Sequence, residues 1–172
     1  MKGVDLDPGL RLAPDDSEMR VSFAAGVDHA EALDRAEAIL RREGVVVLDD
    51  LGDPARYQAC REELAGAYPG YARPDRTRNY GPYEGRHTMG TVIEHAMADR
   101  QLLLPEPVER IAKSLLGPDF MFDSVGLLMA FPGAVDQPRH PDATLFPGTP
   151  LDGLLQPFAL AFAQPLVEMN ER

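Results

Sequence analysis

The 172-residue chain is predicted to fold as one α+β domain, on three observations. Apolar residues recur at helical spacing in several segments of the first two thirds of the chain, whereas two apolar stretches near its end are typical of strands. A stretch rich in Pro, Gly and Asp separates those two stretches. Helices that come first and strands that come late favour an α+β fold, and the length suits a single domain.

The first part of the chain is expected to contain a helix followed by a buried strand. Residues 1–27 show little periodicity and are expected to form a loosely ordered lead-in with room for one short strand. From Asp28 the pattern is helical, and Gly44 is placed to end this helix at its C′ position. The run 45–48 contains three valines, which disfavour a helix and suit a pleated strand. The apolar face of the helix is expected to consist of Leu33, Ala36 and Leu40.

A second helix is expected to begin at Asp53. This residue is a typical N-cap, and Pro54 after it suits the first helical position. Pro69-Gly70 is expected to end the helix. Its inward face is expected to consist of Tyr57, Cys60, Leu64 and Ala67.

The remaining elements are one loop-rich segment, one helix and two strands. Residues 71–90 are expected to form the loop-rich segment, and 107–116 a helix that ends before Gly117-Pro118. Strands are expected over 120–131 and 158–169. The inward face of the helix is expected to consist of Val108, Ile111 and Leu115.

The charge balance argues against several classes of partner. Seventeen Lys and Arg residues against 28 Asp and Glu give a formal net charge of −11. Nucleic acids and anionic membranes attract clustered positive charge, so neither is an expected partner.

The longest apolar stretch, 125–131, is far shorter than the roughly 20 residues of a membrane span, and the N-terminus lacks the apolar region of a signal peptide. The lone Cys60 is expected to be a buried, inert thiol, and a cytoplasmic protein is expected.

One short run carries candidate metal ligands. Four histidines are present, and His140 lies two residues before Asp142 in the sequence QPRHPD, residues 137–142. On an extended backbone, residues i and i+2 point to the same side, so this imidazole and carboxylate can converge on one point. They would then form two of the three ligands of a 2-His-1-carboxylate iron site. A salt-bridging pair in a surface loop is the alternative. His29 and His95 are expected on the solvated surface.

The sequence around this run resembles a known enzyme family. Residues 126–145, GLLMAFPGAVDQPRHPDATL, combine a strand ending in a Pro-Gly turn, a glutamine three residues before a histidine, and His-x-Asp. This combination resembles the core of the phytanoyl-CoA dioxygenase family of iron(II)/2-oxoglutarate oxygenases. Residues 43–48 resemble the early strand of that family, 115–120 its helix end, and 158–167 the strand after its metal loop. The resemblance covers roughly residues 40–172.

The resemblance implies a fold, a cofactor set and a reaction. The fold is a double-stranded β-helix, a jelly-roll of the cupin type, with helices packed on one sheet. His140 and Asp142 would be the first two Fe(II) ligands, and Gln137 would lie near the 2-oxoglutarate or the substrate. The enzyme would oxidise a small-molecule substrate, by hydroxylation for example, and release succinate and carbon dioxide. The protein would keep coordination positions open, orient the substrate and exclude water.

The family pattern continues with features that these 172 residues lack. Family members carry a third ligand, a histidine in a Pro-Gly-Ser-His-like segment, and then an arginine that pairs with 2-oxoglutarate. No histidine follows His140. The expectation is therefore the N-terminal part of a longer enzyme, without the C-terminal strands of the β-helix. The alternatives are a second chain that completes the site, a third ligand supplied by His87 or His95, and an incomplete, inactive site.

Two sets of residues in the loop-rich segment could contact a substrate. Arg86 and His87 lie where family members often place substrate-facing residues, and a surface or packing role is the alternative. A cluster of arginines could bind an anionic substrate through bidentate hydrogen bonds, the alternative being a solvated loop. These arginines are Arg73, Arg76 and Arg78. The rival to an enzyme is a non-catalytic binding module, or a partner subunit of a heteromer, with the same fold.

Overall fold

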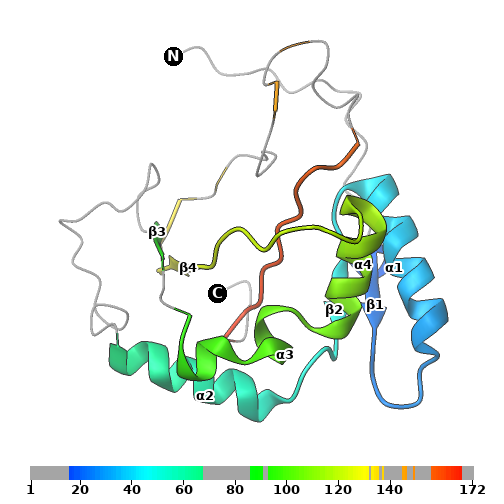
Figure 1. The fold of residues 1–172 in the computed structure, drawn as a ribbon. Coiled ribbons are helices and arrows are strands. Elements are labelled where there is room, and N and C mark those ends of the chain that lie inside the picture. Colours follow the sequence, from blue (N-terminus) through cyan, green and yellow to red (C-terminus); the bar gives the residue numbers. More distant parts are fainter. Residues whose placement is uncertain are drawn as a thin grey trace. The chain divides into compact units, whose positions relative to one another are not determined.

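A computed structural model of the chain describes residues 16–67, 86–90, 93–131, 133–135, 137, 145–146, 149 and 156–167. The chain divides into two compact units, Met1–Leu51 and Gly52–Arg172. Helices and two separate two-stranded sheets make up the regular structure of the described residues (Figure 1). The double-stranded β-helix and the single domain expected from the sequence stay predictions.

The first unit contains two parallel strands joined by a helix. A short 3-10 helix, η1 (Asp16–Met19), leads into strand β1 (Arg20–Ser22), followed by helix α1 (His29–Glu43) and strand β2 (Val47–Asp49). The two strands pair in parallel, in the register that places Arg20 opposite Val47. Parallel neighbours cannot be joined by a tight turn, so α1 serves as the crossover and packs against β1 (Figure 1).

Helix α1 begins and ends where its capping residues predict. The Asp28 carboxylate accepts a hydrogen bond of 2.9 Å from the N–H of Ala30, which satisfies a free donor of the first turn. Gly44 has φ 76°, in the left-handed region, and its N–H donates to Leu40 O at 2.9 Å. Leu33 and Ala36 are buried as predicted, whereas Leu40 is half-buried and Ala32 and Ile39 complete the buried face. This face consists of Ala32, Leu33, Ala36 and Ile39.

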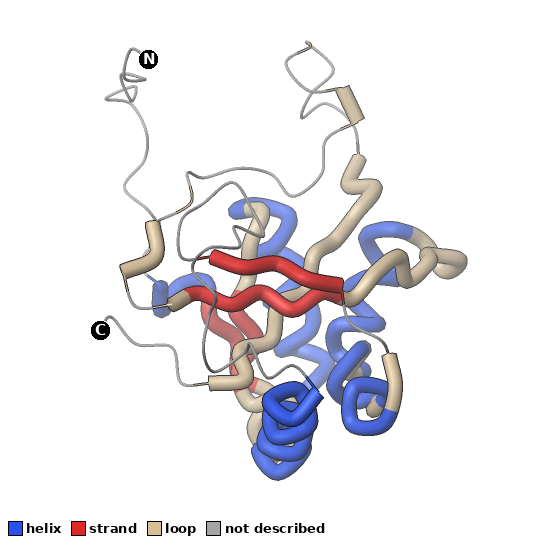
Figure 2. Tube along the Cα trace, turned by 90° about the vertical axis from the view of Figure 1, so that its left-hand side faces the viewer, coloured by secondary structure: helices blue, strands red, loops and turns tan. Residues whose placement is uncertain are grey.

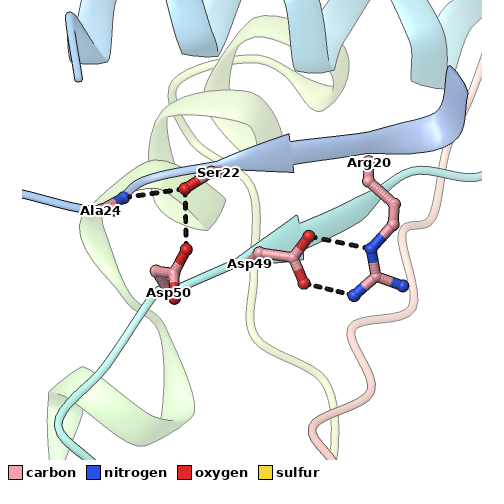
Figure 3. Close-up of polar contacts among 5 residues, drawn as sticks. All are labelled: Arg20, Ser22, Ala24, Asp49 and Asp50. Atoms are coloured by element: carbon pink, nitrogen blue, oxygen red, sulfur yellow. Dashed lines mark hydrogen bonds and ion pairs between the residues drawn. The ribbon is translucent and has the colours of Figure 1, made fainter. Parts of the chain in front are cut away.

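Polar side chains link the ends of β1 and β2 (Figure 3). Arg20 makes two hydrogen bonds to Asp49, of 3.0 Å from Nε and 2.5 Å from Nη2. Ser22 Oγ donates to Asp50 Oδ2 at 2.7 Å. The strand expected over 45–48 is found at Val47–Asp49, and it is half-buried rather than buried. Its length matches β1, since β2 can form ladder hydrogen bonds only where its partner is present.

The second unit contains an antiparallel strand pair and several helices. Its elements are helix α2 (Pro54–Ala67), strand β3 (Arg86–Gly90), 3-10 helix η3 (His95–Ala98), helices α3 (Arg100–Leu103) and α4 (Glu106–Leu116), and strand β4 (Gly126–Ala130). Strands β3 and β4 lie side by side (Figure 2). The prediction of a loop is wrong for the residues of β3, because the strand forms by pairing with a segment far along the chain, which no local pattern reveals.

Helix α2 and strand β4 share the hydrophobic core of this unit. The N-cap expected at Asp53 is present, since its carboxylate accepts from the N–H of Ala55 at 2.9 Å. Ala67, expected to face inward, is exposed in the last turn of the helix. Along β4 the burial alternates, as expected for a strand with one covered face. The buried cluster consists of Cys60, Leu64, Leu102, Leu127 and Met129, with Tyr57, Met97, Phe131 and Leu166 partly buried against it.

The late part of the chain contains less strand than predicted among the described residues. Of the strand expected over 120–131, only β4 forms, because its partner β3 ends at Gly90, opposite Gly126. Residues 158–167, the described part of the second expected strand, form no ladder. They are held by side chains, since Gln164 Nε2 donates to Leu102 O and Leu166 packs on the core.

Helix α4 follows the prediction closely. It begins at Glu106 and ends at Leu116, and Gly117 N–H donates to Lys113 O at 3.0 Å. Val108 and Ile111 are buried as predicted, whereas Leu115 is half-buried. No helix within the described ranges combines the length and apolar character needed to cross a membrane.

Candidate functional site

A sharp turn follows β4 and leads toward the candidate metal motif. The N–H of Ala134 donates to Phe131 O at 2.8 Å, and Gly133 has φ 83°. A type II turn requires such a positive φ at its third residue, and glycine adopts it without strain. The chain therefore leaves the sheet by a turn defined by the bond between Ala134 and Phe131 and by the conformation of Gly133.

Arg86 reaches from the sheet to the chain beyond this turn. It is the first residue of β3 and lies opposite Ala130, the last residue of β4. Its Nε–H donates to Val135 O at 2.8 Å. The guanidinium group is thus engaged by the protein backbone, on the residue that follows the turn. A substrate-binding role for Arg86 stays a prediction.

The other predicted site residues differ in how far the structure describes them. Gln137 lies two residues beyond Val135 and is half-buried. His87 is the second residue of β3, opposite Met129. The metal-binding candidates His140 and Asp142 lie outside the described residues, as do Arg73, Arg76 and Arg78.

The donors of the proposed iron site are of a chemical type that suits Fe(II). One imidazole and one carboxylate, from His140 and Asp142, are donors of the kind found in non-haem Fe(II) sites. Among the residues that the structure describes, no three His, Cys, Asp or Glu side chains come together as a metal site. The ligand set proposed from the sequence therefore rests on the types of the two residues and their spacing in the chain.

The two remaining histidines are exposed, as expected. His29 is the first residue of α1, and its ring meets Phe23 edge-on, with centroids 5.6 Å apart. His95 is the first residue of η3 and has φ 47°. Of the two, His95 is the one in the second unit, which also contains Gln137.

Cys60 is buried, as the sequence predicts. Its Sγ lies 3.2 Å from Met97 Sδ. Burial raises the pKa of the Cys60 thiol, and the nearby Glu63 carboxylate raises it further. The thiol is therefore protonated at neutral pH, which does not suit a nucleophile.

Sequence reasoning missed a set of polar contacts between α2 and the following helices. Arg56 pairs with the carboxylate of Asp99, and Glu63 Oε2 accepts from Ala96 N–H at 2.8 Å. The backbone N–H of Gln101 and then the Arg56 guanidinium lower the pKa of Asp99. The signal is the spacing of Arg56, Cys60 and Glu63, which places all three on one face of the helix.

Comparison of the chain with known protein families, with curated proteins and with solved structures finds no match in any of the three. The resemblance to the phytanoyl-CoA dioxygenase family therefore rests on the sequence motifs alone.

Proposed function

We propose that the chain carries the iron-binding motif of an Fe(II)/2-oxoglutarate-dependent dioxygenase that oxidises a small molecule. The observation that carries this proposal is the order of features from Gly126 to Asp142: a strand, a Pro-Gly step, Gln137 and then His140-Pro141-Asp142. Strand β4 and the turn at Gly133 support it, because they give the first half of this series the local structure that the family pattern expects.

In this proposal His140 and Asp142 hold the metal. Fe(II) with 2-oxoglutarate and dioxygen would supply the oxidation of a C–H bond: one oxygen atom of O2 enters the substrate and the other enters succinate, as 2-oxoglutarate loses carbon dioxide. The chain's own contribution begins at β4, whose side chains Leu127 and Met129 are buried in the core and so fix the strand that precedes the motif. The half-buried amide of Gln137 can both donate and accept hydrogen bonds, and its proposed task is to orient 2-oxoglutarate or the substrate.

The substrate class and location complete the proposal. A net charge of −11 suits a small-molecule substrate better than a nucleic acid. A cytoplasmic location is proposed because the one cysteine, Cys60, forms no internal disulfide. His87 and Arg86 remain candidates for contacting the substrate.

The test is succinate formation from 2-oxoglutarate under air, in the presence of Fe(II) and a reductant. His140→Ala and Asp142→Ala are expected to lower the rate at least about tenfold, since each removes a ligand of the metal. His29→Ala is the matched control, because this histidine is exposed in the first unit and is expected to leave the rate unchanged. Turnover that survives both ligand substitutions would contradict the proposal. A protein with no turnover and no bound metal would favour the non-catalytic binding module.

A further inference from the structure

We propose that Arg86 is a positioning residue, which holds the chain at Val135, between β4 and the metal motif in the sequence, and so restricts where Gln137 lies. The inference rests on the proposed function for its purpose. The hydrogen bonds from which it is argued join residues that the structure describes.

Among the described residues, two hydrogen bonds hold the chain as it leaves β4. The first closes the turn, from Ala134 N–H to Phe131 O at 2.8 Å. The second runs from Arg86 Nε to Val135 O, also at 2.8 Å. Gln137 comes two residues after Val135, and His140 five residues after it. Since each residue spans at most about 3.6 Å, a fixed carbonyl at position 135 restricts the volume that Gln137 can reach.

The place of Arg86 in the sheet fixes the backbone from which this side chain extends. It lies opposite Ala130 in the β3–β4 ladder, so its backbone is tied to the strand from which the loop departs. The neighbouring residues of β4, Leu127 and Met129, are anchored in the core. A guanidinium Nε–H has a fixed direction in the plane of the group, whereas a lysine ammonium rotates freely. Arginine therefore constrains the geometry of its bond to the Val135 carbonyl more than lysine would.

The same contact is expected to add little to global stability. The hydrogen bond is solvent-exposed, and water can replace it when it is lost. A change at Arg86 should accordingly alter the order of residues 133–137 without melting the strand pair. A local loss of order without loss of the strand pair would distinguish a positioning role for Arg86 from a structural one.

The first test needs no metal. Amide hydrogen exchange is measured by NMR on the whole chain, on wild type and on Arg86→Ala. Exchange of the Ala134 amide, whose N–H closes the turn, is expected to rise about tenfold in the variant, while the amides of Leu127 to Met129 stay as protected as in wild type. Arg110→Ala is the matched control, because Arg110 is exposed on α4 and its ion pair with Glu106 spans 4.0 Å. Unchanged exchange at Ala134, or faster exchange along all of β4, would overturn the inference.

The second test follows Co(II), a spectroscopic substitute for iron, by its visible absorption. Arg86→Ala is expected to weaken Co(II) binding about tenfold, the range typical of residues that orient a ligand, and Arg86→Lys to recover part of the loss. His140→Ala is expected to abolish binding. If His140→Ala binds Co(II) as wild type does, the proposed function is wrong. If His140→Ala loses Co(II) but Arg86→Ala binds it with wild-type affinity, the proposed function stands and the positioning role of Arg86 is wrong.

Discussion

Cys60 Sγ and Met97 Sδ lie 3.2 Å apart, at the centre of a face of α2 that binds the segment from η3 to α3. On one side of this contact Arg56 pairs with Asp99, and on the other Glu63 accepts from the N–H of Ala96. The apolar contact is thus flanked by a polar contact about one helical turn away in each direction. This arrangement joins two helical segments that are well separated along the chain.

Cys60 is expected to react slowly with thiol reagents. The side chain is 3% exposed and its pKa is raised by burial and by Glu63, so both access and the thiolate fraction are low. Alkylation of the native protein by iodoacetamide should be about a hundredfold slower than in urea, as measured by mass spectrometry. Native and unfolded protein reacting at similar rates would show that Cys60 is accessible.

Truncation of Leu64 is expected to destabilise the second unit strongly. This side chain is 2% exposed and belongs to the cluster around Cys60, so Leu64→Ala should cost about 3 kcal/mol in the free energy of unfolding. Leu128→Ala removes the same atoms from the outward face of β4, where the side chain is 56% exposed, and should cost less than about 0.5 kcal/mol. Urea unfolding followed by circular dichroism measures both. Equal costs would mean that the covered face of β4 is assigned incorrectly.

Two Gly-to-Ala substitutions are expected to have opposite signs. Gly44 ends α1 with φ 76°, where a Cβ is strained, so Gly44→Ala should destabilise by about 1 kcal/mol. Gly66 lies inside α2 with no atom within 4 Å of an added Cβ, so Gly66→Ala should stabilise by about 0.5 kcal/mol. The same urea experiment compares them. A stabilising Gly44→Ala would contradict the left-handed cap.

The ion pair of Asp99 predicts a dependence of stability on pH. The N–H of Gln101 and the Arg56 guanidinium lower the pKa of this carboxyl, so its contribution is present above the pKa of an unfolded aspartate, about 3.9. That contribution is lost as the pH falls through the lower folded value. Asp99→Asn keeps the cap on α3 but removes the charge, so it should be less stable than wild type at pH 7. The difference should narrow below pH of about 4. Urea midpoints that differ equally at pH 7 and pH 3 would contradict this assignment.

The sequence predicts the helices better than the strands, for a physical reason. The boundaries of α1 depend on Asp28 and Gly44, which act on hydrogen bonds within their own turn, so local reasoning finds them. Strand β3 exists through its pairing with β4, and residues 158–167 are held by Gln164 and Leu166 on distant partners. Contacts of this kind depend on the path of the whole chain and leave no local pattern.

The candidate site divides in the same way. The order of Gly133, Gln137, His140 and Asp142 is visible in the sequence, and it is the basis of the proposed function. The bond from Arg86 to Val135 is not visible there, because it depends on the register that places Arg86 opposite Ala130. Spacing thus suggests which donors meet a metal, whereas the register of the strands determines that Arg86 can reach Val135.

The most direct test of the central claim is an anaerobic titration of the protein with Fe(II) and 2-oxoglutarate, followed by visible absorption. Chelation of Fe(II) by the keto acid gives a charge-transfer band. The proposed function predicts a saturable band that disappears in His140→Ala and in Asp142→Ala and persists in His29→Ala. A band that both His140→Ala and Asp142→Ala leave unchanged would contradict an iron and 2-oxoglutarate site at these two residues.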